Sequence, residues 1–189
     1  MRVSHVALDD FRSYRHAVVE FAPGTTVLLG SNGQGKTNLV EAVSYLSAFS
    51  SHRVSAEQAL VRLPLSADEP QPGGAVVRVR LVTAGERETV IELEIVRGKA
   101  NRAKVNRTQV RPREVLGLLK SVVFSPEDLQ IVRGDPQVRR QFLDDLLIQQ
   151  HPLVAQVKSD FEKVARQRAA LMKSAQAQLR RGFTPDFST

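Results

Sequence analysis

The segment 30–37, with the sequence GSNGQGKT, has the residue types and spacing of a phosphate-binding loop, GxxxxGKT. Glycines let the chain curl around an anion, so that several backbone N–H groups point at it with no Cβ in the way. Apolar residues at helical spacing follow the loop, and the N-terminus of a helix favours negative charge. The pattern predicts a site for the phosphates of a nucleoside triphosphate.

Three side chains in or before this loop are candidates for specific contacts. Lys36 is expected to reach the β- and γ-phosphates, and the hydroxyl of Thr37 is expected to ligate Mg²⁺. Arg12 either contacts a phosphate or the base, or is a surface arginine beside a core Phe11, and its spacing leaves both interpretations open. The predicted nucleotide contacts are Gly30, Ser31, Asn32, Gly33, Gln34, Gly35, Lys36, Thr37 and, as the open case, Arg12.

The elements that position the loop follow from hydrophobic periodicity. The predicted strands are 2–8, 17–21, 25–29, 75–82, 89–96 and 102–110, with a connection at 9–15, a helix after the loop and a short helix at 55–62. Arg78 and Arg80 would point outward from one strand and Glu92 and Glu94 from the next, and opposite charges on facing strands suit an antiparallel hairpin. The region from about 73 to 112 is therefore expected to be an antiparallel β insertion in an α/β fold, without the βαβ rhythm of a parallel sheet.

The remainder of the chain is predicted to be mostly helical. The expected elements are a short helix at 114–120, a buried strand at 121–124, a helix from 125 that ends at Gly134, a helix at 136–150 and a heptad helix at 152–181. The pair Asp144 and Asp145 suggests a metal site, but a helical pattern favours a surface or capping role. We expect an N-terminal lobe at 1–135 and the start of a helical arm at 136–189.

The charge distribution suggests a polyanionic partner. The formal net charge is +7, and a run without Asp or Glu carries seven positive residues: Arg97, Lys99, Arg102, Lys104, Arg107, Arg111 and Arg113. Such a run is either a solvated edge or a surface for a phosphate backbone, and we favour DNA. The absence of interleaved aromatics argues against base stacking on this segment.

Composition excludes several classes. The chain has no cysteine, which excludes disulfides and thiolate chemistry and is compatible with a reducing cytosol. The N-terminus has no apolar signal region, and no run approaches the roughly 18 apolar residues of a membrane span. We therefore expect a cytoplasmic protein without a membrane partner.

The phosphate loop lacks the partners that would complete a hydrolase site within this length. No apolar strand ending in an acid follows the loop, and no NKxD sequence for guanine occurs. Small kinases and GTPases complete their sites in a chain of this size, whereas ABC-type ATPase heads place their second half after a long insertion. The sequence therefore favours the N-terminal part of a split ATPase head.

With these features, the chain resembles the N-terminal half of the RecF family of bacterial DNA replication and repair proteins, which are related to SMC heads. Of the matching motifs, only the phosphate loop is shared widely with other protein families. The sequence FSPEDL followed by GxPxxRRxFLD is close to diagnostic of the RecF family. In the arm helix, Ala169 stands where the family usually has Asn. The matching segments are FRSY at 11–14, GSNGQGKTNLVEA at 30–42, SHR at 51–53, FSPEDL at 124–129, VRGDP at 132–136, RRQFLD at 139–144 and ARQRAALMK at 165–173.

The resemblance implies a P-loop NTPase of ABC/SMC-head type that uses ATP and Mg²⁺, dimerises on ATP and is a weak DNA-dependent ATPase when full-length. It also implies binding of single- and double-stranded DNA and gapped junctions. Recombination mediator proteins would be partners in recombinase loading, recombinational repair, replication-fork maintenance and the SOS response. The signature motif and the Walker B acids of the family lie beyond position 189. We therefore expect no catalytic residue and no ATP hydrolysis from this chain alone.

Two alternatives remain open at this stage. The chain is a small P-loop kinase or transferase whose acid escapes recognition, or a non-catalytic basic module that binds nucleic acid and carries a vestigial loop.

Overall fold

The structure is a computed structural model that describes residues 1–180 except 50, 52 and 55. The chain forms two compact units, the first from Met1 to Pro152 and the second from Leu153 onward. The predicted boundary between lobe and arm at residues 135 and 136 stays a prediction.

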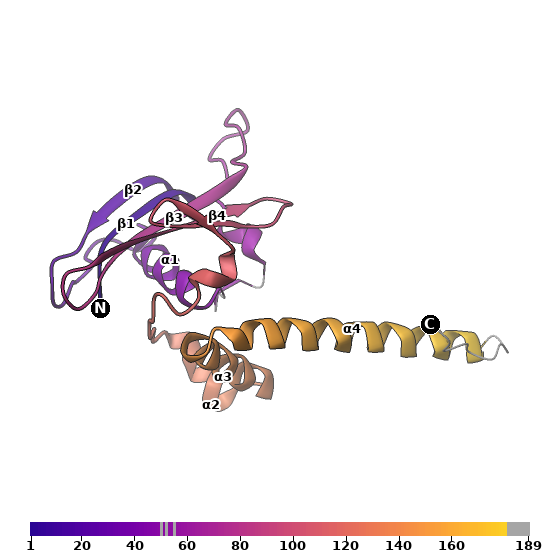
Figure 1. Ribbon diagram of the computed structural model, residues 1–189. Coiled ribbons are helices and arrows are strands. Elements are labelled where there is room, and N and C mark those ends of the chain that lie inside the picture. Colours follow the sequence, from indigo (N-terminus) through magenta and orange to yellow (C-terminus); the bar gives the residue numbers. More distant parts are fainter. Residues whose placement is uncertain (50, 52, 55, 181–189) are drawn as a thin grey trace. The chain divides into compact units, whose positions relative to one another are not determined.

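A six-stranded antiparallel sheet forms the centre of the first unit (Figure 1). In sheet order its strands are β2 (Tyr14–Glu20), β1 (Arg2–Phe11), β3 (Gly74–Val82), β4 (Glu88–Val96), β5 (Arg102–Val105) and β6 (Thr108–Val110). The register places Arg78 opposite Glu92, so the predicted antiparallel hairpin is confirmed. Because β3 also pairs with β1, the predicted insertion shares one continuous sheet with the N-terminal strands.

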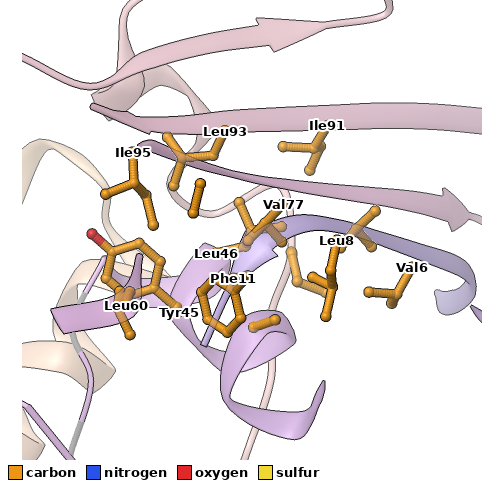
Figure 2. Packing of buried hydrophobic residues seen from close by; sticks show 14 of the residues in the cluster. Val6, Leu8, Phe11, Tyr45, Leu46, Leu60, Val77, Ile91, Leu93 and Ile95 are labelled. Carbon is orange, nitrogen blue, oxygen red and sulfur yellow. The ribbon is translucent and has the colours of Figure 1, made fainter. Parts of the chain in front are cut away.

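The apolar face of the sheet packs against α1 (Lys36–Ala48), the helix that follows the phosphate loop (Figure 1). Tyr45 and Leu46 of this helix join Phe11, Val77 and Leu93 of the strands in one buried cluster (Figure 2). Each such side chain contributes roughly 1.5–3 kcal/mol when fully buried. The start of α1, and with it the phosphate loop, is therefore anchored to the sheet by the core.

Several predicted elements differ in length from the observed ones. β1 and β2 extend to a two-residue turn, Arg12–Ser13, so the predicted connection 9–15 is mostly strand. The predicted strand 102–110 is two strands, because Asn106 and Arg107 both have positive φ, as a tight two-residue hairpin turn requires. Instead of the α-helix expected at 114–120 there is only the 3₁₀ turn η2 (Pro112–Val115). The helix expected at 55–62 is the 3₁₀ turn η1 (Glu57–Leu60), and residue 55 lies outside the described residues.

Two predicted strands are wrong for this structure. Residues 25–29 and 121–124 adopt no strand. Leu28 and Val123 are half-buried, but other apolar side chains of these segments are open to solvent, with Leu29 88% and Phe124 83% exposed. A continuous apolar run predicts a strand buried on both faces, but such a strand forms only where a neighbouring backbone accepts its hydrogen bonds. Within the part of the chain that the structure describes, neither segment has such a neighbour.

The helices after the sheet follow the sequence prediction closely. A 3₁₀ turn, η3 (Pro126–Asp128), leads into α2 (Leu129–Arg133), which ends at Gly134 as expected. α3 (Pro136–Gln150) is capped at its N-terminus by Asp135, whose side chain accepts a hydrogen bond from the backbone N–H of Gln137. Ser121 joins α3 to α1, because its backbone N–H donates to Gln149 Oε1 at 3.0 Å and its hydroxyl donates to Ser47 Oγ at 2.8 Å.

In the second unit the described residues form α4 (Leu153–Arg180), which confirms the long helix expected there. Its heptad apolar side chains are mostly exposed, including Val157, Phe161 and Val164. Among the residues described, no helix combines the length and the apolar character needed to cross a membrane.

Candidate nucleotide-binding site

The phosphate loop owes its shape to glycines with positive φ. Gly33 and Gly35 have φ of 84° and 93°, in the left-handed region that side chains with a Cβ rarely adopt. Gly35 is the residue that caps α1, and Lys36 is the first residue of the helix. The loop therefore ends at the positive end of a helix dipole, as the sequence predicts.

The residues around the loop fit the polyphosphate of a nucleotide. Lys36 Nζ donates to the carbonyl oxygens of Gly30 and Ser31, at 2.7 Å each, which holds its ammonium group across the loop. Thr37 is exposed on the first turn of α1, and that turn carries no acidic residue that would repel an anion. Asn32, Gly33 and Gln34 are likewise exposed. The donor set is thus open to a triphosphate, and the Thr37 hydroxyl is accessible to a metal ion.

The turn between β1 and β2 packs directly against the end of the loop. The Tyr14 hydroxyl donates to the carbonyl oxygen of Gly35 at 3.1 Å. A Cβ on Gly35 would lie 2.9 Å from both Ser13 Oγ and Tyr14 Oη, closer than real Cβ contacts. Gly35 is therefore required both by its φ and by this close approach. Asn38 follows Thr37 in α1, and its Nδ2 donates to Ser13 Oγ at 2.9 Å.

Arg12 is not the surface arginine of the second interpretation, because its side chain is held by other residues of the chain. Its Nε and Nη2 donate to the two carboxylate oxygens of Glu41, at 2.9 and 2.6 Å, and its Nη1 donates to the carbonyl oxygen of Ala59 at 3.0 Å. The Arg12 side chain is only 17% exposed. Any contact between Arg12 and a nucleotide stays a prediction.

Glu41 is the functional candidate that sequence reasoning missed. It is 2% exposed and also contacts Arg53 Nη1 at 3.1 Å and the Ser51 hydroxyl at 2.6 Å. Burial by itself raises its pKa, but hydrogen bonds from Arg12 and Ser51 and the charges of Arg12 and Arg53 prevail and lower it. The sequence offers no signal for this site, because its partners lie 29, 10 and 12 residues away.

Arg53 links the same helix to the segment that follows it. Its Nη1 donates to Asn38 Oδ1 at 2.8 Å as well as to Glu41. His52, between Ser51 and Arg53 in the SHR segment, lies outside the described residues.

The basic run does not form one uninterrupted positive patch. Lys104 Nζ lies 2.7 Å from Glu92, and Arg102 lies 3.7 Å from Glu94, so both are paired with acids of β4. Arg97 Nε and Nη2 are buried, without a hydrogen-bond partner among the described residues. The exposed members of the run are Lys99, Arg102, Lys104, Arg107, Arg111 and Arg113.

The Lys104–Glu92 pair belongs to a charge ladder across the solvent face of the sheet. It runs over five strands through His16, Asp9, Arg78, Glu92 and Lys104, each contacting the next. Burial raises the pKa of Asp9 and of Glu92, but hydrogen bonds and charges from their basic neighbours prevail and lower both. Positive and negative side chains alternate on this face of the sheet. We therefore expect the excess positive charge to lie at the turns between its strands.

Asp144 and Asp145 lie within α3, as the helical interpretation predicts. Asp145 Oδ1 accepts a hydrogen bond from Gln141, one turn earlier, at 2.8 Å. In the described part of the chain no group of three or more His, Cys, Asp or Glu residues could hold a metal ion.

Comparison with known families gives the context of this loop. The family model described as the RecF/RecN/SMC N terminal domain matches residues 2–181. The chain belongs to this family.

Curated relatives are similar over nearly the whole chain. The DNA replication and repair protein RecF of Beutenbergia cavernae is 55% identical over 176 residues, which cover 93% of this chain and 42% of that protein. RecF of Frankia alni is 50% identical over 190 residues, which cover 100% of this chain and 48% of that protein. The chain thus spans less than half the length of these relatives.

Solved structures agree with the family. The recombination mediator protein RecF-ATPrS of the RecFOR pathway matches with a TM-score of 0.82 and 29% identity, over 94% of this chain and 46% of that one. An SMC ATPase matches with a TM-score of 0.62 at 22% identity, over 76% of this chain and 98% of that one, which shows the fold alone. The fold is that of a P-loop ATPase head of the ABC/SMC type.

Proposed function

We propose that this chain binds ATP with Mg²⁺ through residues 30–37 and acts in DNA replication and repair. The observation that carries the proposal is the phosphate loop itself, with Gly35 capping α1 and Lys36 held across the loop. The similarity to RecF-ATPrS supports ATP as the nucleotide. Thr37 would ligate Mg²⁺, and the metal would neutralise charge on the phosphates.

The finer role that we propose is recombinational repair, replication-fork maintenance and the SOS response, by helping to load recombinase at gapped DNA. The names of the RecF relatives support a place in replication and repair, and the RecFOR pathway of the solved relative supports recombination mediators as partners. Single- and double-stranded DNA would be bound by exposed basic side chains outside the paired ladder. The proposed site of action is the cytoplasm.

We propose further that hydrolysis requires more protein than these residues. Support comes from the coverage of less than half of the relatives, and from the exposed apolar side chains at 25–29 and 121–124. In a longer protein, additional strands would pair with these segments and cover them. An ATP-dependent homodimer would then complete the site, and the weak DNA-dependent ATPase would belong to that assembly.

Titration of a fluorescent ATP analogue with Mg²⁺ tests the first step. Lys36→Ala is expected to weaken binding at least tenfold, because the ammonium group that would neutralise the β- and γ-phosphates is lost. Lys104→Ala is the matched control, since it removes a lysine of the outer sheet face and should leave affinity unchanged. Unchanged affinity in Lys36→Ala would sink ATP binding by this loop, and turnover with a small-molecule phosphate acceptor would favour a P-loop transferase instead.

A further inference from the structure

The start of α1 is bound by three consecutive residues, the two of the β1–β2 turn and the first residue of β2. Gly35, Asn38 and Glu41 are spaced three residues apart and lie on the same side of the helix start. Their partners follow in reverse order, since Tyr14 bonds Gly35, Ser13 bonds Asn38 and Arg12 bonds Glu41. Three successive residues of one segment thus hold the first two turns of the helix and the end of the phosphate loop.

We propose that Glu41 is a positioning residue for the phosphate loop, acting through Arg12 and Arg53. This inference rests on the proposed binding of ATP and deepens it. Glu41 lies on the second turn of α1, outside the loop itself. Its role is to fix the helix start, and the N–H groups there, against the segments that carry the two arginines.

The loop needs such external support because it has few contacts of its own. Residues 30–34 are exposed. The hydrogen bonds described at its two ends are those of Lys36 to Gly30 and Ser31, and those that Gly35 accepts from Tyr14 and Leu39. A preorganised anion site requires its donors to be fixed before the ligand arrives. In this chain that rigidity comes from the contacts on the Glu41 face of α1.

Glu41 is the member of this face whose loss releases the most groups. Its carboxylate accepts from Nε and Nη2 of Arg12, from Arg53 Nη1 and from the Ser51 hydroxyl. Bidentate contacts of this kind fix orientation as well as distance. Removing the carboxylate charge would leave Arg12, whose side chain is 17% exposed, and the more exposed Arg53 without this anionic partner, so both would be expected to move.

The test compares Glu41→Gln with Tyr45→Phe in the 189-residue chain. Tyr45 lies on the same helix and is 1% exposed, and its hydroxyl donates to Glu57 away from the loop. Both variants lose a buried polar interaction of α1, but only Glu41→Gln disturbs the face that holds the loop. Affinity is measured with the fluorescent ATP analogue and Mg²⁺, and is corrected for the folded fraction from thermal melts.

We expect Glu41→Gln to weaken binding about tenfold and Tyr45→Phe to leave it within twofold. Amide NMR signals supply a readout independent of affinity: those of Gly33 and Gly35 should shift in nucleotide-free Glu41→Gln and stay in place in Tyr45→Phe. If Glu41→Gln does not fold, Asn38→Ala replaces it, because it removes the bonds to Ser13 and Arg53 without burying a charge. A severalfold loss of affinity is expected for Asn38→Ala.

Lys36→Ala separates the two ways in which these expectations can fail. If Lys36→Ala leaves affinity unchanged, ATP binding by the loop is overturned. If Lys36→Ala weakens binding but Glu41→Gln matches wild type or Tyr45→Phe in both affinity and amide signals, the loop binds ATP and the positioning role is overturned.

Discussion

The Arg12 guanidinium and the Glu41 carboxylate form a bidentate pair, with Nε to Oε2 at 2.9 Å and Nη2 to Oε1 at 2.6 Å. Arg12 stands in the two-residue turn after β1 with φ of 53°, and Glu41 lies on the second turn of α1. The pair joins the end of β1 to the helix that begins at the phosphate loop.

Gly35→Ala should weaken ATP binding more than the same substitution at a glycine of similar φ elsewhere in the chain. The variant forces a Cβ into the left-handed region and within 2.9 Å of Ser13 Oγ and Tyr14 Oη. Gly85 in the β3–β4 turn has a similar φ of 79°, but nothing lies within 4 Å of its Cβ position. Gly85→Ala should cost about 1–2 kcal/mol in stability with unchanged ATP affinity, whereas Gly35→Ala should also weaken ATP binding tenfold or more. Equal affinities in the two variants would contradict the close-approach argument.

Leu8→Ala and Leu29→Ala should separate a buried strand from an exposed segment. Leu8 is fully buried in the core, so its truncation should lower the free energy of unfolding by about 2–5 kcal/mol. Leu29 is 88% exposed, so Leu29→Ala should change the free energy of unfolding by about 0.5 kcal/mol or less. Urea denaturation of the 189-residue chain measures both. A loss above about 2 kcal/mol in Leu29→Ala would show that residues 25–29 are buried in solution.

The free energy of unfolding should rise with pH in the acid range. The pKa values of Asp9, Glu41 and Glu92 are lowered from ordinary values of 3.8, 4.5 and 4.5. In that window the unfolded chain binds more protons than the folded chain, so the stabilisation is present above the ordinary values and lost as pH falls through the lowered ones. Thermal melts at pH 3 to 6 check this.

Glu92→Gln provides the variant for the acid titration. It removes one of the three lowered carboxylates and should therefore flatten the dependence of stability on pH below about 4.5. Glu86→Gln is the control, because Glu86 is an exposed turn residue and the slope should stay that of wild type. A Glu92→Gln slope as steep as the wild-type slope would place the titration in other groups.

DNA binding, if it uses the basic run, should depend more on its turns than on its paired strand residues. Lys104 and Arg102 already face Glu92 and Glu94, whereas Arg107 is exposed in the β5–β6 turn. Alanine in place of Arg107 should remove about 0.9 from the slope of log affinity against log salt concentration for duplex DNA.

The comparison variant for DNA binding is Lys104→Ala, for which a smaller change of slope is expected. The triple replacement of Arg102, Lys104 and Arg107 by Ala gives the largest change of slope that these three residues can produce. An unchanged slope in the triple variant would move the DNA surface to another part of the protein.

The sequence by itself determined the local features of this protein. The phosphate loop, the helix after it, the alternating strands at 75–82 and 89–96, and the helices that start after Asp135 and Pro152 all follow from glycine placement, capping and periodicity. These signals lie within a few residues of the structure they specify, because backbone conformation and the facing of side chains are local properties.

Only the tertiary structure decided what depends on distant partners. Whether 25–29 and 121–124 become strands depends on a neighbouring backbone, and in this structure none pairs with them among the described residues. The sequence marked Arg12 as a possible phosphate contact and passed over Glu41, whereas the fold brings the two together across 29 positions. Likewise, the basic run looked uninterrupted until the sheet register placed Glu92 beside Lys104. Pairing in space, unlike periodicity, leaves no trace within a local stretch of sequence.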